Sequence, residues 1–174
     1  MSEALTGPRP ERIGLVRRLA AAAYDAFALF GLLFGATALV LPLNDGEAIR
    51  PGHPWHVPYI VYLAVVTFGY FGLGWTRGGQ TLGMRAWRIR LRAAAGGAAD
   101  WRTAAVRFVV AIVSWAACGL GFLWAVLDRE GRAWHDIASR TRLQAVPRVS
   151  APSAPATSPP PPARAKAAPR KRRG

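Results

Sequence analysis

Hydrophobic residues are concentrated in three long blocks, at residues 19–43, 57–75 and 104–127, and polar segments separate them. As a helix with a rise of about 1.5 Å per residue, the first block would extend for about 37 Å, which exceeds the roughly 30 Å thickness of a bilayer hydrocarbon core. The second block has no charged residue, and Trp55 and Trp75 lie at its ends, as in the aromatic belts of membrane helices. These two blocks predict two helices that span a membrane.

The third block, residues 104–127, is apolar except for Arg107 and is interrupted by Gly119 and Gly121. It can form a third full span, or a re-entrant helical hairpin that is broken at these glycines and buried in protein or in a wet cavity. We favour the hairpin, because a full span would place the basic residues that follow it outside the cell. The expected fold is an all-α integral membrane bundle of two full spans plus this third block.

The polar segment between the second and third blocks has a period of two. Trp87, Ile89 and Leu91 fall on one face, and arginines alternate with them on the other. This pattern predicts a short strand with a basic face over residues 84–92. Residues 141–146 also favour extended chain. If the third block is a hairpin, the two strands can meet on the cytoplasmic side.

Both ends of the chain differ in composition from the apolar centre. Residues 1–14 are polar, and residues 147–174 are rich in proline, alanine and serine and end in a basic run. Such a composition cannot form a core, so we expect a disordered basic tail. The transmembrane domain is therefore expected to cover residues 15–146.

The charge distribution sets the expected topology. The chain has 23 basic and 9 acidic residues although 52% of its residues are hydrophobic. Arginines are dense before the first block and in the loop at residues 76–103, and they are sparse in the loop at residues 44–56. Basic segments favour the cytoplasmic side, so we expect both termini there. The abundance of arginine and alanine suggests a GC-rich bacterial genome and hence a multi-pass protein of the bacterial cytoplasmic membrane.

Asp25 is the unusual charge of the first block. A carboxylate inside a membrane helix costs on the order of 2.5–3.5 kcal/mol on insertion scales. Arg18 lies two turns earlier on nearly the same helix face, and Arg107 and Asp136 are further charges that can lie nearby. We expect Arg18, Asp25 and Asp136 to form one charge constellation, with Arg107 as an additional partner. The constellation can be functional, it can be a structural ion pair, or Asp25 can be a hydrated anchor at the interface.

Gly31 and Gly35 form a G-x-x-x-G sequence in the first block. Small residues at this spacing let helices approach closely. We expect packing against the second block, and homodimerisation is the alternative.

The sequence contains no motif that is typical of enzymatic chemistry. It has no nucleophile elbow, phosphate loop or zinc-protease motif, so we expect neither an enzyme nor a cofactor. His53 and His56 lack a third ligand at a matching spacing, so no metal site is expected. The basic run at residues 170–173 lacks interleaved aromatic residues, which favours anionic lipid headgroups over nucleic acid as its partner.

Three segments carry a resemblance to a known family: GLVRRLAAAAYDAF, RGGQTLGMRAWRIRL and LDREGRAWHDIASRT. Together they resemble the bacterial RDD family of membrane proteins over residues 11–146. The resemblance implies that Arg18, Asp25 and Asp136 are the arginine and the two aspartates that name the family. The family often has lysine after T-L-G, where this chain has Met84 followed by Arg85. The resemblance implies a small integral membrane domain with a proposed transport role.

Two main functions remain open from the sequence. In the first, the domain helps to move an ion or a small solute, and Asp25 binds a cation or a proton. Three helices make a thin pathway, so this function requires an oligomer. In the second, the domain is a non-transporting module that assembles with or regulates a membrane partner through its glycine face and basic tail. A third hypothesis is a tether that binds anionic lipid through the tail.

We expect topology reporters fused at Gly174 and within residues 76–103 both to be cytoplasmic, because basic residues flank each of these segments. Paired alkaline phosphatase and fluorescent-protein fusions measure this directly. A periplasmic Gly174 together with a cytoplasmic loop would show that the third block is a full span.

Overall fold

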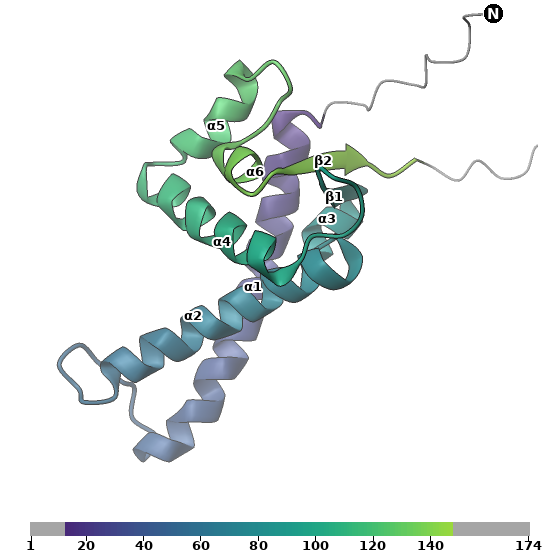
Figure 1. The fold of residues 1–174 in the computed structure, drawn as a ribbon. Coiled ribbons are helices and arrows are strands. Elements are labelled where there is room, and N and C mark those ends of the chain that lie inside the picture. Colours follow the sequence, from purple (N-terminus) through teal and green to yellow (C-terminus); the bar gives the residue numbers. More distant parts are fainter. Residues whose placement is uncertain (1–12, 148–174) are drawn as a thin grey trace, which may run out of the picture.

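The computed structural model describes residues 13–147, and Figure 1 shows them as a mostly helical protein with one small sheet. The predicted segments at residues 1–14 and 147–174 therefore lie almost entirely outside the described residues. The elements in chain order are α1 (Leu15–Val40), the 3₁₀ turn η1 (Leu41–Asn44), α2 (His56–Leu73), the π-helical turn η2 (Gly74–Gly78), α3 (Leu82–Ala86), β1 (Ile89–Ala93), α4 (Trp101–Ala116), α5 (Leu120–Leu127), α6 (Trp134–Ala138) and β2 (Thr141–Ala145).

Two helical segments are long and apolar enough to cross a bilayer, as the first two blocks predict. They are Leu15–Asn44, which joins α1 to η1, and His56–Gly78, which joins α2 to η2. In Figure 1 these segments form a hairpin whose connecting loop projects far from the other elements. Apolar side chains on this projecting part are exposed, as expected for a lipid-facing surface; examples are Phe27, Phe30 and Phe34.

The third apolar block is broken, as predicted. Helices α4 and α5 meet at a bend of 99°. Cys118 and Gly119 lie at the break and both have left-handed backbone, with φ of 53° and 79°. Glycine adopts such a conformation without steric cost, so Gly119 suits the break. The two helices are thus close to perpendicular, neither one straight helix nor an antiparallel pair.

The two predicted strands pair with each other. Strands β1 and β2 are antiparallel, and Leu91 lies opposite Leu143. Ile89 and Leu91 are almost completely buried, at 1% and 0% exposure, as the period of two implies.

The predicted strand over residues 84–92 is wrong at its start, because residues 84–86 belong to helix α3. Thr81 caps this helix: its hydroxyl accepts a hydrogen bond from the backbone N–H of Met84. This capping bond stabilises a helical turn locally, and the alternating pattern governs the backbone only from Ile89 onward.

The core lies where the start of α1 meets η2, α3, β1 and α4, far from the projecting loop. Its buried hydrophobic side chains are Ile13, Ala21, Trp75, Met84, Ile89, Leu91, Ala99 and Ala104. Met84, which stands where the family often has lysine, is therefore a core residue here.

The predicted packing of Gly31 and Gly35 against the second block is wrong. Both glycines are exposed, and a Cβ atom added at either would meet nothing within 4 Å. Helices α1 and α2 are instead joined on either side of these glycines, by the Tyr70–Asp25 hydrogen bond of 2.7 Å and by the Thr37–Tyr59 hydrogen bond of 2.8 Å. The glycine face is thus open, and homodimerisation through it stays a prediction.

Candidate functional site: two buried carboxylate clusters

Asp25 is buried, with 5% exposure, and three neutral groups donate hydrogen bonds to it. The Tyr70 hydroxyl and the Gly83 backbone N–H donate to Oδ1, at 2.7 and 2.8 Å. The Thr81 hydroxyl donates to Oδ2 at 2.5 Å. These four residues form what we call the Asp25 cluster, in which dipolar donors rather than an opposite charge stabilise the carboxylate.

The sequence around Gly83 explains why the carboxylate is held there. The first backbone N–H groups of a helix have no partner within the helix, and that of Gly83, near the start of α3, is donated to Asp25. A Cβ atom at Gly83 would overlap the backbone carbonyl oxygen of Ala21 and lie 2.9 Å from Cγ of Asp25. Only glycine permits this approach, so Asp25 fastens α3 against α1.

Asp136 belongs to a second group, the Asp136 cluster, which it forms with Arg18 and Arg107. The Asp136 side chain is completely buried. Nη1 of Arg18 lies 2.7 Å from Oδ2, and Nη1 of Arg107 lies 2.5 Å from Oδ1. The backbone N–H of Ala133 also donates to Oδ2, at 3.0 Å, so the carboxylate caps helix α6 as well.

Both arginines have further partners, which tie the Asp136 cluster to three further parts of the chain. Arg18, on α1, also donates to the carbonyl oxygen of Gly131 at 2.5 Å. Arg107, on α4, also donates to the Thr141 hydroxyl at the start of β2, at 2.8 Å, and its guanidinium lies 5.2 Å from the centre of the Trp75 ring. The latter contact is a cation–π interaction.

Electrostatics keeps Asp136 charged and its neighbour His135 neutral. Burial alone would raise the pKa of Asp136, but Arg107, His135 and Arg18 together hold it well below its usual value. Burial, aided by Arg107, lowers the pKa of His135 to about 3. Nδ1 of His135 is buried and has no hydrogen-bond partner within the described residues. A neutral histidine therefore lies beside the ionised cluster.

The structure divides the predicted constellation into two parts. Arg18 and Asp136 are brought together, and Arg107 joins them as expected. Asp25 does not join them: within residues 13–147 its hydrogen bonds come from Tyr70, Thr81 and a backbone N–H. The predicted structural ion pair for Asp25 is thus replaced by a hydrogen-bonded cap on α3.

Sequence reasoning missed the partners of Asp25. Tyr70 lies within an apolar block, and a backbone donor leaves no side-chain signal. The signal in the sequence is T-L-G at residues 81–83, in which Thr81 is a helix N-cap residue type and Gly83 leaves its backbone N–H open to a close acceptor. Every oxygen of Asp25 and Asp136 accepts at least one hydrogen bond from the protein, so a cation at either carboxylate would compete with these donors. Within the described chain, no group of three or more His, Cys, Asp or Glu side chains could hold a metal ion.

The described chain has two helical segments of bilayer-crossing length, and buried arginine–aspartate pairs lie near the start of the first. These features are typical of a small helical protein of membrane type. A model of the RDD family matches residues 12–140, and the chain belongs to that family. The resemblance inferred from the sequence is therefore confirmed. No match was found among curated proteins or among solved structures.

We expect Asp25→Asn to lower stability by about 1–3 kcal/mol, because an amide nitrogen would oppose one of the three buried donors. Arg18→Gln should not compensate for this loss, so the effects of the two substitutions should add. Arg18→Gln and Asp136→Asn should instead be strongly non-additive, because these residues share an ion pair. Melting temperatures of the single and double variants in detergent measure both couplings. A rescue of Asp25→Asn by Arg18→Gln would show that the two charges interact after all.

We expect the protein to lose stability between pH 7 and pH 5 through His135. The folded-state pKa of about 3 is below the ordinary value of 6.5, so the unfolded chain takes up the proton first, and unfolding is favoured as pH falls below about 6.5. The effect is at most about 1.4 kcal/mol per pH unit. Melting temperatures across this range should fall less steeply for His135→Gln. An unchanged slope in that variant would assign the pH dependence to other groups.

Proposed function

We propose that this RDD-family protein is a non-enzymatic membrane module that assembles with or regulates a partner in the bacterial cytoplasmic membrane, rather than a transporter. The observation that carries this proposal is that donors of the protein itself bind both oxygens of each buried carboxylate. A transport site binds its ion weakly enough to release it and needs ligand positions that the ion can occupy. Here those positions are taken by side chains and backbone that hold α1, α3, α4 and α6 together.

The proposed topology has both termini in the cytoplasm and α4–α5 as a re-entrant element. The pairing of β1 with β2 supports it, because the segment before α4 and the segment after α5 lie in one sheet. The 99° break at the glycines supports it as well, because a straight crossing would carry β2 away from β1. The arginines of these strands then face anionic lipid headgroups on the same side.

Two exposed features supply surfaces for assembly. The Gly31–Gly35 face of α1 is open and lies on a segment that can cross the bilayer. Such a face fits a helix of a membrane partner or of a second copy. The basic segments around β1 and β2 add electrostatic attachment to the bilayer surface, and nucleic acid is not an expected partner.

Transport of an ion or a small solute remains the competing function. It would use Asp25 as the cation or proton ligand and would require an oligomer. In that case Tyr70 and Thr81 would have to release the carboxylate during each cycle, and the start of α3 would lose its external hydrogen-bond acceptor.

We expect the purified full-length protein in liposomes to give no proton, sodium or potassium flux above that of empty liposomes, because its carboxylates are bound internally. Fluorescent indicators trapped in the lumen measure the flux. A saturable flux in the wild-type protein, reduced in Asp25→Asn protein that still inserts, would overturn the proposal and support transport.

Assembly is tested separately, in native membranes. Cross-linking in native membranes should yield a defined complex, and Gly35→Leu should reduce its amount because the added side chain covers the open face. Ala26→Leu is a matched control, since it adds a similar side chain at an exposed position on the opposite side of α1. A complex that forms equally in all three proteins would show that the glycine face is not the contact.

A further inference from the structure

Two adjoining cavities lie at the end of the α1–α2 hairpin opposite the carboxylate clusters. The small chamber has a volume of about 70 Å³ and the large chamber a volume of about 270 Å³. Both are bounded by Val40 of α1, Ile49 of the connecting loop and Tyr59 of α2. The end of α1, the loop and the start of α2 thus border two adjoining cavities that are partly open to the surroundings.

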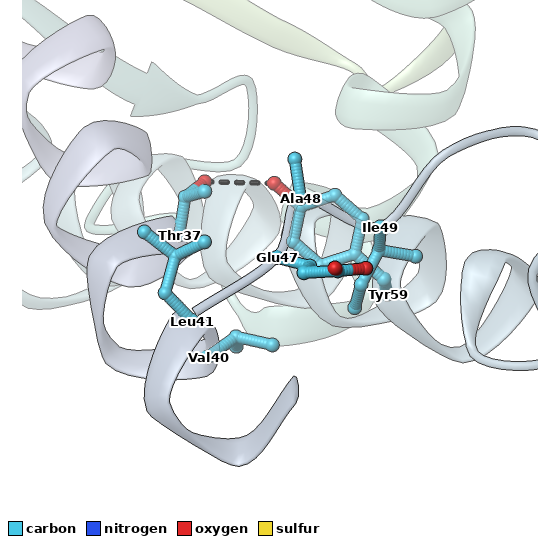
Figure 2. A pocket seen from close by; sticks show the side chains of 7 residues that line it. All are labelled: Thr37, Val40, Leu41, Glu47, Ala48, Ile49 and Tyr59. Carbon is cyan, nitrogen blue, oxygen red and sulfur yellow. Dashed lines mark hydrogen bonds between the residues drawn. The ribbon is translucent and has the colours of Figure 1, made fainter. Parts of the chain in front are cut away.

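The small chamber, shown in Figure 2, combines apolar walls with a carboxylate and two hydroxyl groups. Glu47 lines it, together with Thr37 and Tyr59. The hydroxyl of Thr37 donates its hydrogen to the carbonyl oxygen of Leu33, so Tyr59 must be the donor in the bond that joins the two hydroxyls. The Tyr59 oxygen then keeps its acceptor capacity, and both it and the Glu47 carboxylate favour a positively charged occupant.

The large chamber is apolar and aromatic. Its lining residues are Val40, Leu43, Asn44, Ile49, Trp55, Pro58, Tyr59 and Tyr62. Three of these eight are aromatic, and Tyr and Trp faces attract ammonium groups as well as hydrocarbon. The chamber approaches the lower end of the size range of small-molecule sites, which are concave and mostly apolar with a few polar groups.

Hydrogen bonds within the loop hold these walls in place. The backbone N–H of Gly46 donates to the carbonyl of Leu41 at 2.9 Å, and that of Glu47 donates to the carbonyl of Asn44 at 2.8 Å. The Asn44 side chain donates to the carbonyl of Glu47, also at 2.9 Å. The residue that carries the carboxylate is therefore fixed to the end of the first helix.

Charge complementarity selects the occupant. The loop between α1 and α2 carries Asp45 and Glu47 against Arg50, whereas the chain as a whole has a net charge of +14. We propose that the two chambers bind a lipophilic ammonium compound, with its ammonium group in the small chamber beside Glu47 and its apolar body in the large chamber. This site is separate from the carboxylate clusters, and its occupancy does not depend on the assembly function proposed above.

The test is equilibrium binding of octyltrimethylammonium to the full-length protein in a non-ionic maltoside detergent, with protein-free micelles as the blank. Wild-type protein should bind it saturably. Glu47→Gln should weaken binding by about fivefold or more, the scale of one partly exposed ion pair of about 1 kcal/mol. Asp45→Asn is the matched control, because it removes the same charge from the same loop at a residue that does not line either chamber. It should change binding much less.

Two further measurements test the shape and the sign of the site. Ile49→Trp fills the wall that the chambers share and should abolish saturable binding while leaving the melting temperature close to that of the wild type. Octyl sulfate has the same chain with an anionic head and should not bind saturably. The proposal is overturned if wild-type protein shows no saturable binding, if Glu47→Gln and Asp45→Asn have equal effects, or if octyl sulfate binds equally well.

Discussion

The fold depends most on the buried ion pairs of Asp136 with Arg18 and Arg107. Removing three charged groups from water is costly, and it is tolerated only when each finds further hydrogen bonds. Here the Gly131 carbonyl, the Thr141 hydroxyl and the Ala133 backbone N–H supply these hydrogen bonds, and the Trp75 ring adds a cation–π contact to Arg107. Because the two arginines come from α1 and α4, this carboxylate joins the first span to the broken third block. A packing of α1 and α4 that separated them from Asp136 would leave the two buried guanidinium groups without this counter-ion.

The sequence predicted the long helices, the break in the third block and the proximity of Arg18, Arg107 and Asp136, because strong hydropathy and isolated charges have few compatible placements. It failed where a local or backbone interaction decides. The period of two at residues 84–86 is overridden by the Thr81 cap, and Asp25 is bound partly by the backbone N–H of Gly83, a donor that any residue carries. Gly31 and Gly35 show the converse, since small residues permit close packing without requiring it.

The two ends of the long hairpin have opposite characters. At one end, charged groups are fully enclosed and satisfied by the protein, which suits a rigid anchoring layer. At the other, an aromatic space with one carboxylate stays open between the helix ends and the loop. Tyr70 lies on α2 and donates to Asp25 on α1, and Tyr59, nearer the start of α2, lines both cavities. Helix α2 therefore contributes a tyrosine to each end.

The dependence of Asp25 on Tyr70, Thr81 and Gly83 constrains the order of events when the chain is made. The ribosome completes the first apolar block long before these three donors emerge, and an unpartnered carboxylate in a membrane helix costs on the order of 2.5–3.5 kcal/mol. The first helix alone therefore carries this cost when it enters the lipid. The smallest unit in which all three hydrogen bonds to Asp25 can form extends to Gly83 and includes the second span, so the acid of the first helix finds its partners only after the second has been synthesised.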